Sequence, residues 1–333
     1  MKAILMSAPG AAADVLTLQE VAMPQIRQSN DILVRIKAAG VNPVDTKLRS
    51  RGTYYPDRLP TILGCDGAGI VEAVGKQASK FKVGDEVYFC NGGIGGHPGN
   101  YAEYAVVNEN FAAAKPKSLS FAEAAAAPLV LITAWESLFD CCELEEDNTV
   151  LIHAGAGGVG HVAIQLAKAA GTRVCTTVSN AEKAEFVRGL GADKVIQYPN
   201  EDFVAATLAW TDGKGVDLGF DTVGGETLNR TFEAVRFYGD IVTLLQPDAN
   251  THWKTARMRN QRLSMELMLT PMQHGLVEVQ SRHGEILADC AELFESGELK
   301  IHVSHTLPLA EAAEAHRLVE QGGMMGKVVL VME

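Results

Sequence analysis

Three glycines at residues 155, 157 and 160 have the spacing that a dinucleotide diphosphate needs. An apolar run, a glycine-rich turn and apolar residues at helical spacing follow one another at residues 150–154, 155–160 and 162–167. In such a turn Gly155 allows the tight bend, Gly157 allows close approach of the diphosphate, and Gly160 lets the helix pack on the strand. Unpaired N–H groups at the helix start favour negative charge. The segment therefore predicts a dinucleotide site in which Gly158 and Val159 also contact the cofactor.

The residues after the second predicted strand, at 173–178, distinguish the two nicotinamide cofactors. An acidic residue about 20 positions past the glycines would bind the ribose 2′-hydroxyl of NAD. The chain has Ser179, Asn180 and Lys183 there instead. A hydroxyl, an amide and a cation suit a 2′-phosphate, so we expect NADPH. In the alternative interpretation, Ser179 only caps the helix at 182–190 and Lys183 is solvated. The two interpretations are compatible.

Composition excludes several classes of function. The chain has 333 residues, 47% of them hydrophobic, and a net charge of −12, which argues for two globular domains and against a nucleic acid or an anionic membrane as partner. Six cysteines form no C-x-x-C pair, and the N-terminus enters a strand pattern without a signal-peptide core. We therefore expect free thiols in a reducing compartment and a cytoplasmic protein.

Two patterns of secondary structure divide the chain. Residues 1–122 contain short β-rich runs separated by Pro, Gly, Asn and Asp turns, which predict a mainly antiparallel β domain. From residue 123 to 271 strands alternate with helices, at 150–154, 173–178, 194–197, 216–220, 240–245 and 263–269. This alternation predicts an α/β domain with a doubly wound parallel Rossmann sheet. Residues 272–333 should return to the first domain.

The order of these segments resembles the medium-chain dehydrogenase/reductase superfamily, and most closely its zinc-free quinone oxidoreductase branch, which includes zeta-crystallin. The resemblance runs nearly end to end, through residues 39–45, 64–71, 83–87, 99–104, 133–135, 154–160 and 326–330. It implies that residues 1–122 form a GroES-like catalytic domain.

The zinc ligands of the related alcohol dehydrogenases are missing. Where those enzymes carry a cysteine and a histidine, this chain has Asn42 and Cys65, and Cys90 stands alone where a structural zinc would need several cysteines. We expect no metal, although Cys65 with Asp66 could be a remnant site. Hydride delivery to an electron-poor quinone or enone needs no Lewis acid, so the missing ligands favour reduction.

The resemblance also indicates candidate site residues. Asn42 would hydrogen-bond the nicotinamide ribose or the substrate carbonyl, or would only shape the turn before Pro43. Asp45 comes from the same segment. Tyr54 could orient a carbonyl, while water could supply the proton. The remaining candidates are cofactor contacts. Thr133 would lie near the nicotinamide and Tyr198 near the adenosine end. Thr222 and Val223 follow the fourth Rossmann strand, Leu244 follows the fifth, and Lys327 comes from the tail.

Three functions compete on this sequence. The leading one is NADPH-dependent reduction of quinones or α,β-unsaturated carbonyls by direct hydride transfer without zinc. A second is an enoyl-thioester reductase of the same superfamily. Arg257, Arg259 and Arg262 would then contact a carrier phosphate, or they would only lie on a helix face at a subunit surface. The third is a dinucleotide-binding protein without turnover, as crystallin relatives suggest. In each case we expect a homodimer paired through residues 263–269, the far edge of the sheet.

Overall fold

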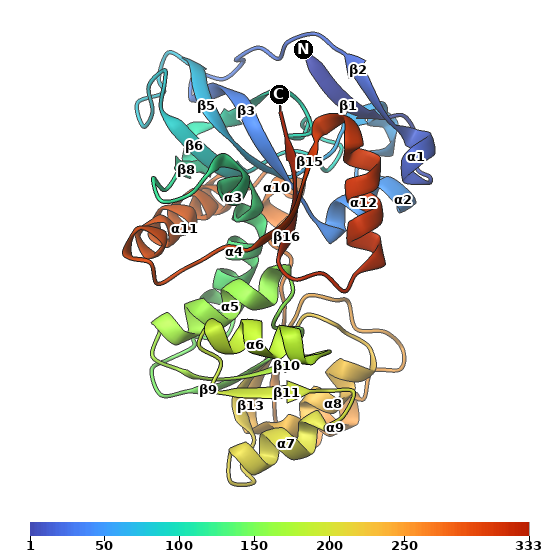
Figure 1. Ribbon diagram of the computed structural model, residues 1–333, viewed down its shortest axis with the longest axis vertical. Helices are drawn as coiled ribbons and strands as arrows, with labels where there is room; N and C mark the ends of the chain where they lie inside the picture. Colours follow the sequence, from blue (N-terminus) through green and yellow to red (C-terminus); the bar gives the residue numbers. More distant parts are fainter. Residues whose placement is uncertain (333) are drawn as a thin grey trace. The chain divides into compact units, whose positions relative to one another are not determined.

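The computed structural model describes residues 1–332, and these form two compact units (Figure 1). The first unit contains residues 1–132, 269–297 and those from 301 onward. The second contains residues 133–268 and 298–300. The boundary lies about ten residues later than the expected end of the first domain at 122, because α3 (Phe121–Ala126) packs on the strands of the first unit.

The first unit contains a mainly antiparallel sheet. Its strand order is β15-β16-β3-β5-β6-β8, with β7 paired to β3, and a smaller sheet has the order β2-β1-β4. Alternate residues of β3, such as Ile32, Val34 and Ile36, are buried against Val71 and Phe89, as period-two patterning requires. The strands are β1 (Lys2–Met6), β2 (Leu16–Glu20), β3 (Asp31–Val41), β4 (Thr61–Ile62), β5 (Asp66–Val74), β6 (Glu86–Cys90), β7 (Tyr104–Asn108), β8 (Ala112–Ala114), β15 (Val303–Pro308) and β16 (Lys327–Val331).

The helices of this unit are mostly short. They are α1 (Ala12–Val15), α2 (Pro43–Arg51), α3, α10 (Thr270–His274), α11 (Val277–Ser296) and α12 (Ala312–Gln321), with 3₁₀ turns at Pro56–Arg58, Glu109–Phe111 and Leu309–Glu311. The longest, α11, has 20 residues. No helix within residues 1–332 is long and apolar enough to cross a membrane. Helix α4 (Pro128–Trp135) leads the chain from the first unit into the second.

The second unit is the predicted doubly wound parallel sheet. Its order, β11-β10-β9-β12-β13-β14, reverses direction between β9 and β12, and all its pairs are parallel. Helices α5 and α6 pack on one face and α7, α8 and α9 on the other (Figure 1). The elements are the π-helix Glu136–Asp140, β9 (Thr149–Ile152), α5 (Gly158–Ala169), β10 (Arg173–Val178), α6 (Ala181–Gly189), β11 (Lys194–Gln197), α7 (Phe203–Trp210), β12 (Val216–Asp221), α8 (Glu226–Ala234), β13 (Val235–Thr243), α9 (Trp253–Met258) and β14 (Arg262–Met265).

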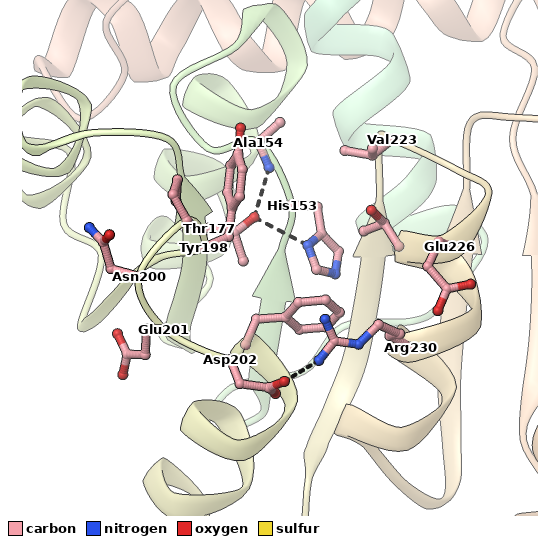
Figure 2. Close-up of a pocket in the computed structure, with 13 residues that line it drawn as sticks. His153, Ala154, Thr177, Tyr198, Asn200, Glu201, Asp202, Val223, Glu226 and Arg230 are labelled. Atoms are coloured by element: carbon pink, nitrogen blue, oxygen red, sulfur yellow. Dashed lines mark hydrogen bonds and ion pairs between the residues drawn. The ribbon is translucent and has the colours of Figure 1, made fainter.

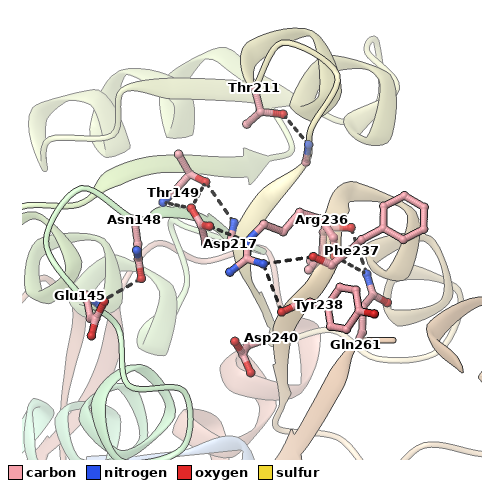
Figure 3. Close-up of polar contacts among 12 residues, drawn as sticks. Glu145, Asn148, Thr149, Thr211, Asp217, Arg236, Phe237, Tyr238, Asp240 and Gln261 are labelled. Atoms are coloured by element: carbon pink, nitrogen blue, oxygen red, sulfur yellow. Dashed lines mark hydrogen bonds and ion pairs between the residues drawn. The ribbon is translucent and has the colours of Figure 1, made fainter. Parts of the chain in front are cut away.

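The amino ends of these strands are fixed by polar contacts (Figure 3). Asp217 accepts hydrogen bonds from the backbone N–H and the hydroxyl of Thr149, at 2.8 and 2.7 Å, and from Arg236 at 2.6 Å. Arg236 also donates to the carbonyl oxygens of Phe237 and Tyr238. These contacts hold a bulge of β13, in which Tyr238 has a φ of +58°.

The last strand is shorter than predicted. The apolar run at 263–269 predicts a strand of that length, but β14 ends at Met265. Met268 and Leu269 are buried outside the ladder, just before α10. Burial, rather than strand pairing, accounts for their apolar side chains.

Candidate functional site

The glycine turn has the geometry that its sequence predicts. A Cβ on Gly155 would lie 2.0 Å from Thr176 Oγ1, and one on Gly160 would lie 2.4 Å from the carbonyl oxygen of Ala154. Both positions therefore need glycine because the turn packs tightly against strand and helix. A Cβ on Gly157 would meet only the Ala154 oxygen, at 3.2 Å. It would otherwise fill the open side of the turn.

The start of α5 is suited to an anion. Gly157 caps the helix without a side-chain hydrogen bond, so no side chain neutralises the N–H groups of its first turn, which includes Gly158 and Val159. The helix has 12 residues, and its dipole adds positive potential at this end. A diphosphate fits here: the backbone supplies donors, and the missing Cβ of Gly157 leaves room.

A cavity of about 580 Å³ opens beside the turn, at the carboxyl ends of the strands. In Figure 2, Thr177 and Tyr198 lie on one side of His153, while Val223 and Glu226 lie on the other. Ligands of open α/β sheets bind at this edge, where the strand order reverses. The lining residues are His153, Ala154, Thr177, Tyr198, Pro199, Asn200, Glu201, Asp202, Phe203, Val223, Glu226, Thr227 and Arg230.

The floor of the cavity is held by hydrogen bonds between side chains. His153 is buried, with Nδ1 3.2 Å from the hydroxyl of Thr177 and Nε2 2.9 Å from that of Thr231. Burial lowers the pKa of His153 to about 4, so the ring is neutral near pH 7. Phe203 packs edge-on against this ring at 4.8 Å. Arg230 stacks over Phe203 and pairs with Asp202. His153 is thus a core residue, and the lining of the cavity includes the charged residues Glu201, Asp202, Glu226 and Arg230.

The residues expected to bind a 2′-phosphate lie at the end of β10. The cap of α6 is Asn180, whose Oδ1 accepts the Lys183 N–H at 2.9 Å, so Ser179 is not the capping residue. Ser179 and Lys183 are partly exposed, and Tyr198, which follows β11, is exposed and lines the cavity. The cap of α6 therefore lies one residue later than the alternative interpretation places it, and binding of a 2′-phosphate by Ser179 and Lys183 stays a prediction.

The other predicted cofactor residues of the second unit differ in their surroundings. Thr222 donates from its hydroxyl to the carbonyl oxygen of His153 at 2.9 Å, which ties β12 to β9. The buried carboxylate of Asp221 accepts the N–H groups of Val223 and Gly224, so the side chain of Val223 is exposed toward the cavity. Leu244 is partly buried after β13, and Thr133 is buried in α4.

The first-unit candidates Asn42 and Asp45 are fully buried. They form the capping box of α2: Asp45 Oδ2 accepts the backbone N–H of Asn42 at 2.8 Å. The same oxygen accepts the hydroxyl of Tyr101 at 3.0 Å, and Cys65 Sγ lies 3.8 Å from Oδ1. Burial, countered partly by the Asn42 hydrogen bond, raises the pKa of Asp45 to about 7.

Lys327 is also buried in this cluster. Its ammonium group donates to Asn42 Oδ1, and Nζ lies 3.7 Å from Asp66 Oδ2. Asn42 Nδ2 donates to the same carboxylate oxygen at 2.8 Å. Of the three predicted catalytic residues only Tyr54 is exposed; burial of part of its ring raises the pKa of the phenol.

Two thiols border the cluster. Cys65 and Cys90 hydrogen-bond to each other, and this bond and burial raise the pKa of Cys65 well above its ordinary value. Among residues 1–332 no three His, Cys, Asp or Glu side chains are arranged to hold a metal ion. The cation that these carboxylates face is the ammonium group of Lys327.

Sequence reasoning missed Tyr101 as a partner of Asp45 and His316 as a partner of Tyr101. His316 Nε2 lies 3.3 Å from the Tyr101 hydroxyl, and both residues are buried. Burial lowers the pKa of His316 to about 3. Its only sequence signal is a histidine on the apolar face of an amphipathic helix, which is typical of any core position.

Comparisons with known proteins agree with this architecture. Residues 28–117 match the alcohol dehydrogenase GroES-like domain, and residues 190–330 match the zinc-binding dehydrogenase family. A quinone oxidoreductase of Pseudomonas aeruginosa is 34% identical over 301 residues, covering 90% of this chain and 91% of its own.

Solved structures extend the similarity. An alcohol dehydrogenase superfamily protein from Novosphingobium aromaticivorans has a TM-score of 0.92 at 34% identity and full coverage of both chains. The Escherichia coli quinone oxidoreductase in complex with NADPH has a TM-score of 0.86 at 30% identity, covering 99% of this chain and 100% of the other. The chain therefore belongs to the medium-chain dehydrogenase/reductase superfamily, as an oxidoreductase of its quinone oxidoreductase branch.

Proposed function

We propose that the protein reduces quinones or α,β-unsaturated carbonyls with NADPH, by direct hydride transfer and without zinc. The observation that carries the proposal is the glycine turn at an uncapped helix start, in a chain that is 34% identical to a quinone oxidoreductase over nine-tenths of its length. The Escherichia coli quinone oxidoreductase was solved with NADPH bound, which supports the choice of cofactor.

In this proposal the second unit binds and orients the cofactor. The N–H groups at the start of α5 bind the diphosphate, Ser179 and Lys183 bind the 2′-phosphate, and the cavity beside Tyr198 and Val223 takes the adenosine end. Bound NADPH supplies the hydride. Thr133 and Leu244 lie on segments that would orient the nicotinamide.

Tyr54 is the exposed member of the predicted catalytic set, and its raised pKa keeps the phenol protonated near neutral pH. A neutral phenol can donate a hydrogen bond to the oxygen on which negative charge develops. Asn42 and Asp45 are buried and would act by holding α2. Solvent water would supply the final proton.

A substrate panel tests this function against its alternatives. NADPH oxidation would be followed with 1,4-benzoquinone, a short enone and an enoyl-CoA. Turnover of the first two supports the proposal, preference for the thioester supports the enoyl-thioester reductase, and binding of NADPH without turnover supports the crystallin-like role.

Arg262 begins β14, and Arg257 and Arg259 precede it closely, so this cluster lies at the amino end of the strand, opposite the cofactor edge. That location disfavours it as the contact for a carrier phosphate.

Chelation should leave the activity intact. Lys327 already places a positive charge beside the Asp66 carboxylate, and no zinc is needed to polarise an electron-poor substrate. Turnover of 1,4-benzoquinone before and after exhaustive dialysis against EDTA should agree, and elemental analysis should find no stoichiometric zinc. One zinc per chain, with activity lost on its removal, would overturn this part of the proposal.

We also propose that the protein forms a homodimer paired through β14. This strand ends the six-stranded sheet, and Met265, its last residue, and Leu267, two residues later, are exposed. An uncovered edge invites pairing, and a two-fold axis requires the same strand from both chains. Light scattering at micromolar concentration should give about twice the 35.6 kDa of one chain. A mass near 35.6 kDa would reject the dimer.

The variant for this test is Met265→Pro. Glu266 N–H donates to the Thr243 carbonyl of β13, so by alternation the N–H of Met265 faces the free edge. Proline there removes an outward donor and leaves the pairing with β13 intact. Leu267→Pro is a poorer choice than the predicted strand suggested, because Leu267 lies beyond the end of β14. Met265→Ala keeps the N–H and serves as the control.

A further inference from the structure

Four segments that are far apart in the sequence meet around the ammonium group of Lys327. β16 pairs antiparallel with β3, with Val328 opposite Val41, and this register brings Lys327 beside Asn42 at the start of α2. Asp66, the first residue of β5, lies 3.7 Å from Nζ. The other oxygen of Asp66 accepts the N–H of Leu129, in the first turn of α4, at 2.8 Å.

The carboxamide of Asn42 has only one favourable orientation in these surroundings. Its Oδ1 accepts from Lys327, and its Nδ2 donates to Asp66 Oδ2. A flipped carboxamide would bring its NH₂ group against the ammonium and its oxygen against the carboxylate. Both contacts would be repulsive inside a buried cluster, where water cannot relieve them. Lys327 and Asp66 therefore fix this side chain together.

Lys327 also favours the ionised form of Asp66. Burial raises the pKa of this carboxyl, and the nearby ammonium lowers it again. As a carboxylate, Asp66 accepts from Asn42 with one oxygen and from Leu129 with the other. Without the ammonium, the carboxylate would be a buried charge without its cation, which is costly.

We propose that Lys327 is a positioning residue of the reductase, whose buried ammonium orients Asn42 and, through Asp66, holds the first turn of α4. This inference rests on the proposed function. The hydrogen bonds of Lys327 are made to Asn42 and Asp66, and the expected contact between Lys327 and the cofactor stays a prediction. One turn after Leu129, the same helix carries Thr133, a predicted nicotinamide contact.

The test compares Lys327→Met with Lys115→Met. Lys115 is a matched control in the same unit: its side chain is 5% exposed, against 3% for Lys327, and its Nζ lies 3.2 Å from a carboxylate, that of Glu86. Three quantities are measured on each protein: kcat/KM for 1,4-benzoquinone, the Kd of NADPH by fluorescence titration, and Tm. We expect Lys327→Met to lower kcat/KM by about 10- to 100-fold, the range for a misplaced site. The Kd of NADPH should stay within about twofold, since the glycine turn is untouched.

Two further variants distinguish positioning from mere stability. Lys327→Ala should regain part of its kcat/KM in the presence of propylammonium, which can occupy the space of the lost side chain. Lys327→Met combined with Asp66→Asn leaves no buried unpaired charge and should be no less active than Lys327→Met alone, because both residues act through one network. If Lys327→Met alone does not fold, the same measurements are made on the double variant.

The outcomes separate the inference from the function on which it rests. A wild-type protein without quinone turnover rejects the proposed function. An active wild type with an equally active Lys327→Met rejects the role of Lys327 alone. The role is also rejected if Lys115→Met loses as much activity, if the amine rescues nothing, or if neither Lys327 variant folds, because Lys327 would then serve only stability.

Discussion

The protein should bind NADPH at least ~10-fold more tightly than NADH, a difference of about 1.4 kcal/mol. Ser179 and Lys183 present a hydroxyl and a cation at the end of β10, where an NAD-specific protein would carry a carboxylate. A 2′-phosphate gains charge-assisted hydrogen bonds from such groups, whereas a 2′-hydroxyl gains little from a lysine. Titration of the fluorescence of each reduced cofactor measures both affinities.

Lys183→Ala should narrow this preference by weakening NADPH binding while the affinity for NADH stays nearly constant. The matched control is Arg188→Ala, which removes one positive charge from the last turn of the same helix, away from the end of β10. If the two variants weakened NADPH binding equally, general attraction by the helix, rather than contact with the phosphate, would be responsible. Equal affinities of the wild type for NADPH and NADH would reject the assignment of the 2′-phosphate residues.

The glycine turn could be predicted from the sequence because most of its determinants are contiguous. Strand, turn and helix follow one another directly along residues 149–169. The steric demand on Gly160 comes from Ala154 in the turn, and that on Gly155 from Thr176 of the next strand. The parallel sheet was predictable for the same reason: each strand and helix carries its own periodicity.

The buried cluster of the first unit could not be predicted. Lys327 and Asn42 are 285 residues apart, and only the register of β16 against β3 brings them together. The sequence shows a lysine before an apolar strand, which is typical of a solvated strand end. The partnership of Arg230 with Asp202 beside the cavity was hidden in the same way, since it depends on the packing of α7 against α8.

The end of β14 shows a different limit. Seven residues from Leu263 to Leu269 are mostly apolar, but only the first three belong to the strand. A short apolar run does not distinguish a strand from a buried turn. Met268 and Leu269 are core residues, and the apolar pattern wrongly assigns them to the ladder.

Asp45→Asn should stabilise the protein at pH 8 and should do so much less at pH 5. The folded-state pKa of Asp45 is about 7, raised by burial from 3.8. Because an unfolded chain ionises this carboxyl near 3.8, Asp45 costs stability progressively as pH rises from about 4 to 7, and the cost is constant above that range. About three pKa units correspond to a free energy of unfolding on the order of 4 kcal/mol at pH 8.

Asparagine removes this cost without removing the capping box. Its Oδ1 can accept the Asn42 N–H and the Tyr101 hydroxyl, and its NH₂ group would face the sulfur of Cys65.

Urea unfolding at pH 5 and pH 8 measures the effect of Asp45→Asn on the free energy of unfolding. The matched control is Asp85→Asn, since Asp85 also accepts an N–H from three residues earlier, that of Lys82 at 3.0 Å, but does so at the surface. The difference between wild type and Asp45→Asn should grow with pH, and that for Asp85→Asn should not. A parallel response of the two variants would mean that Asp45 is ionised at little cost, and that its three donors, rather than its burial, decide its charge.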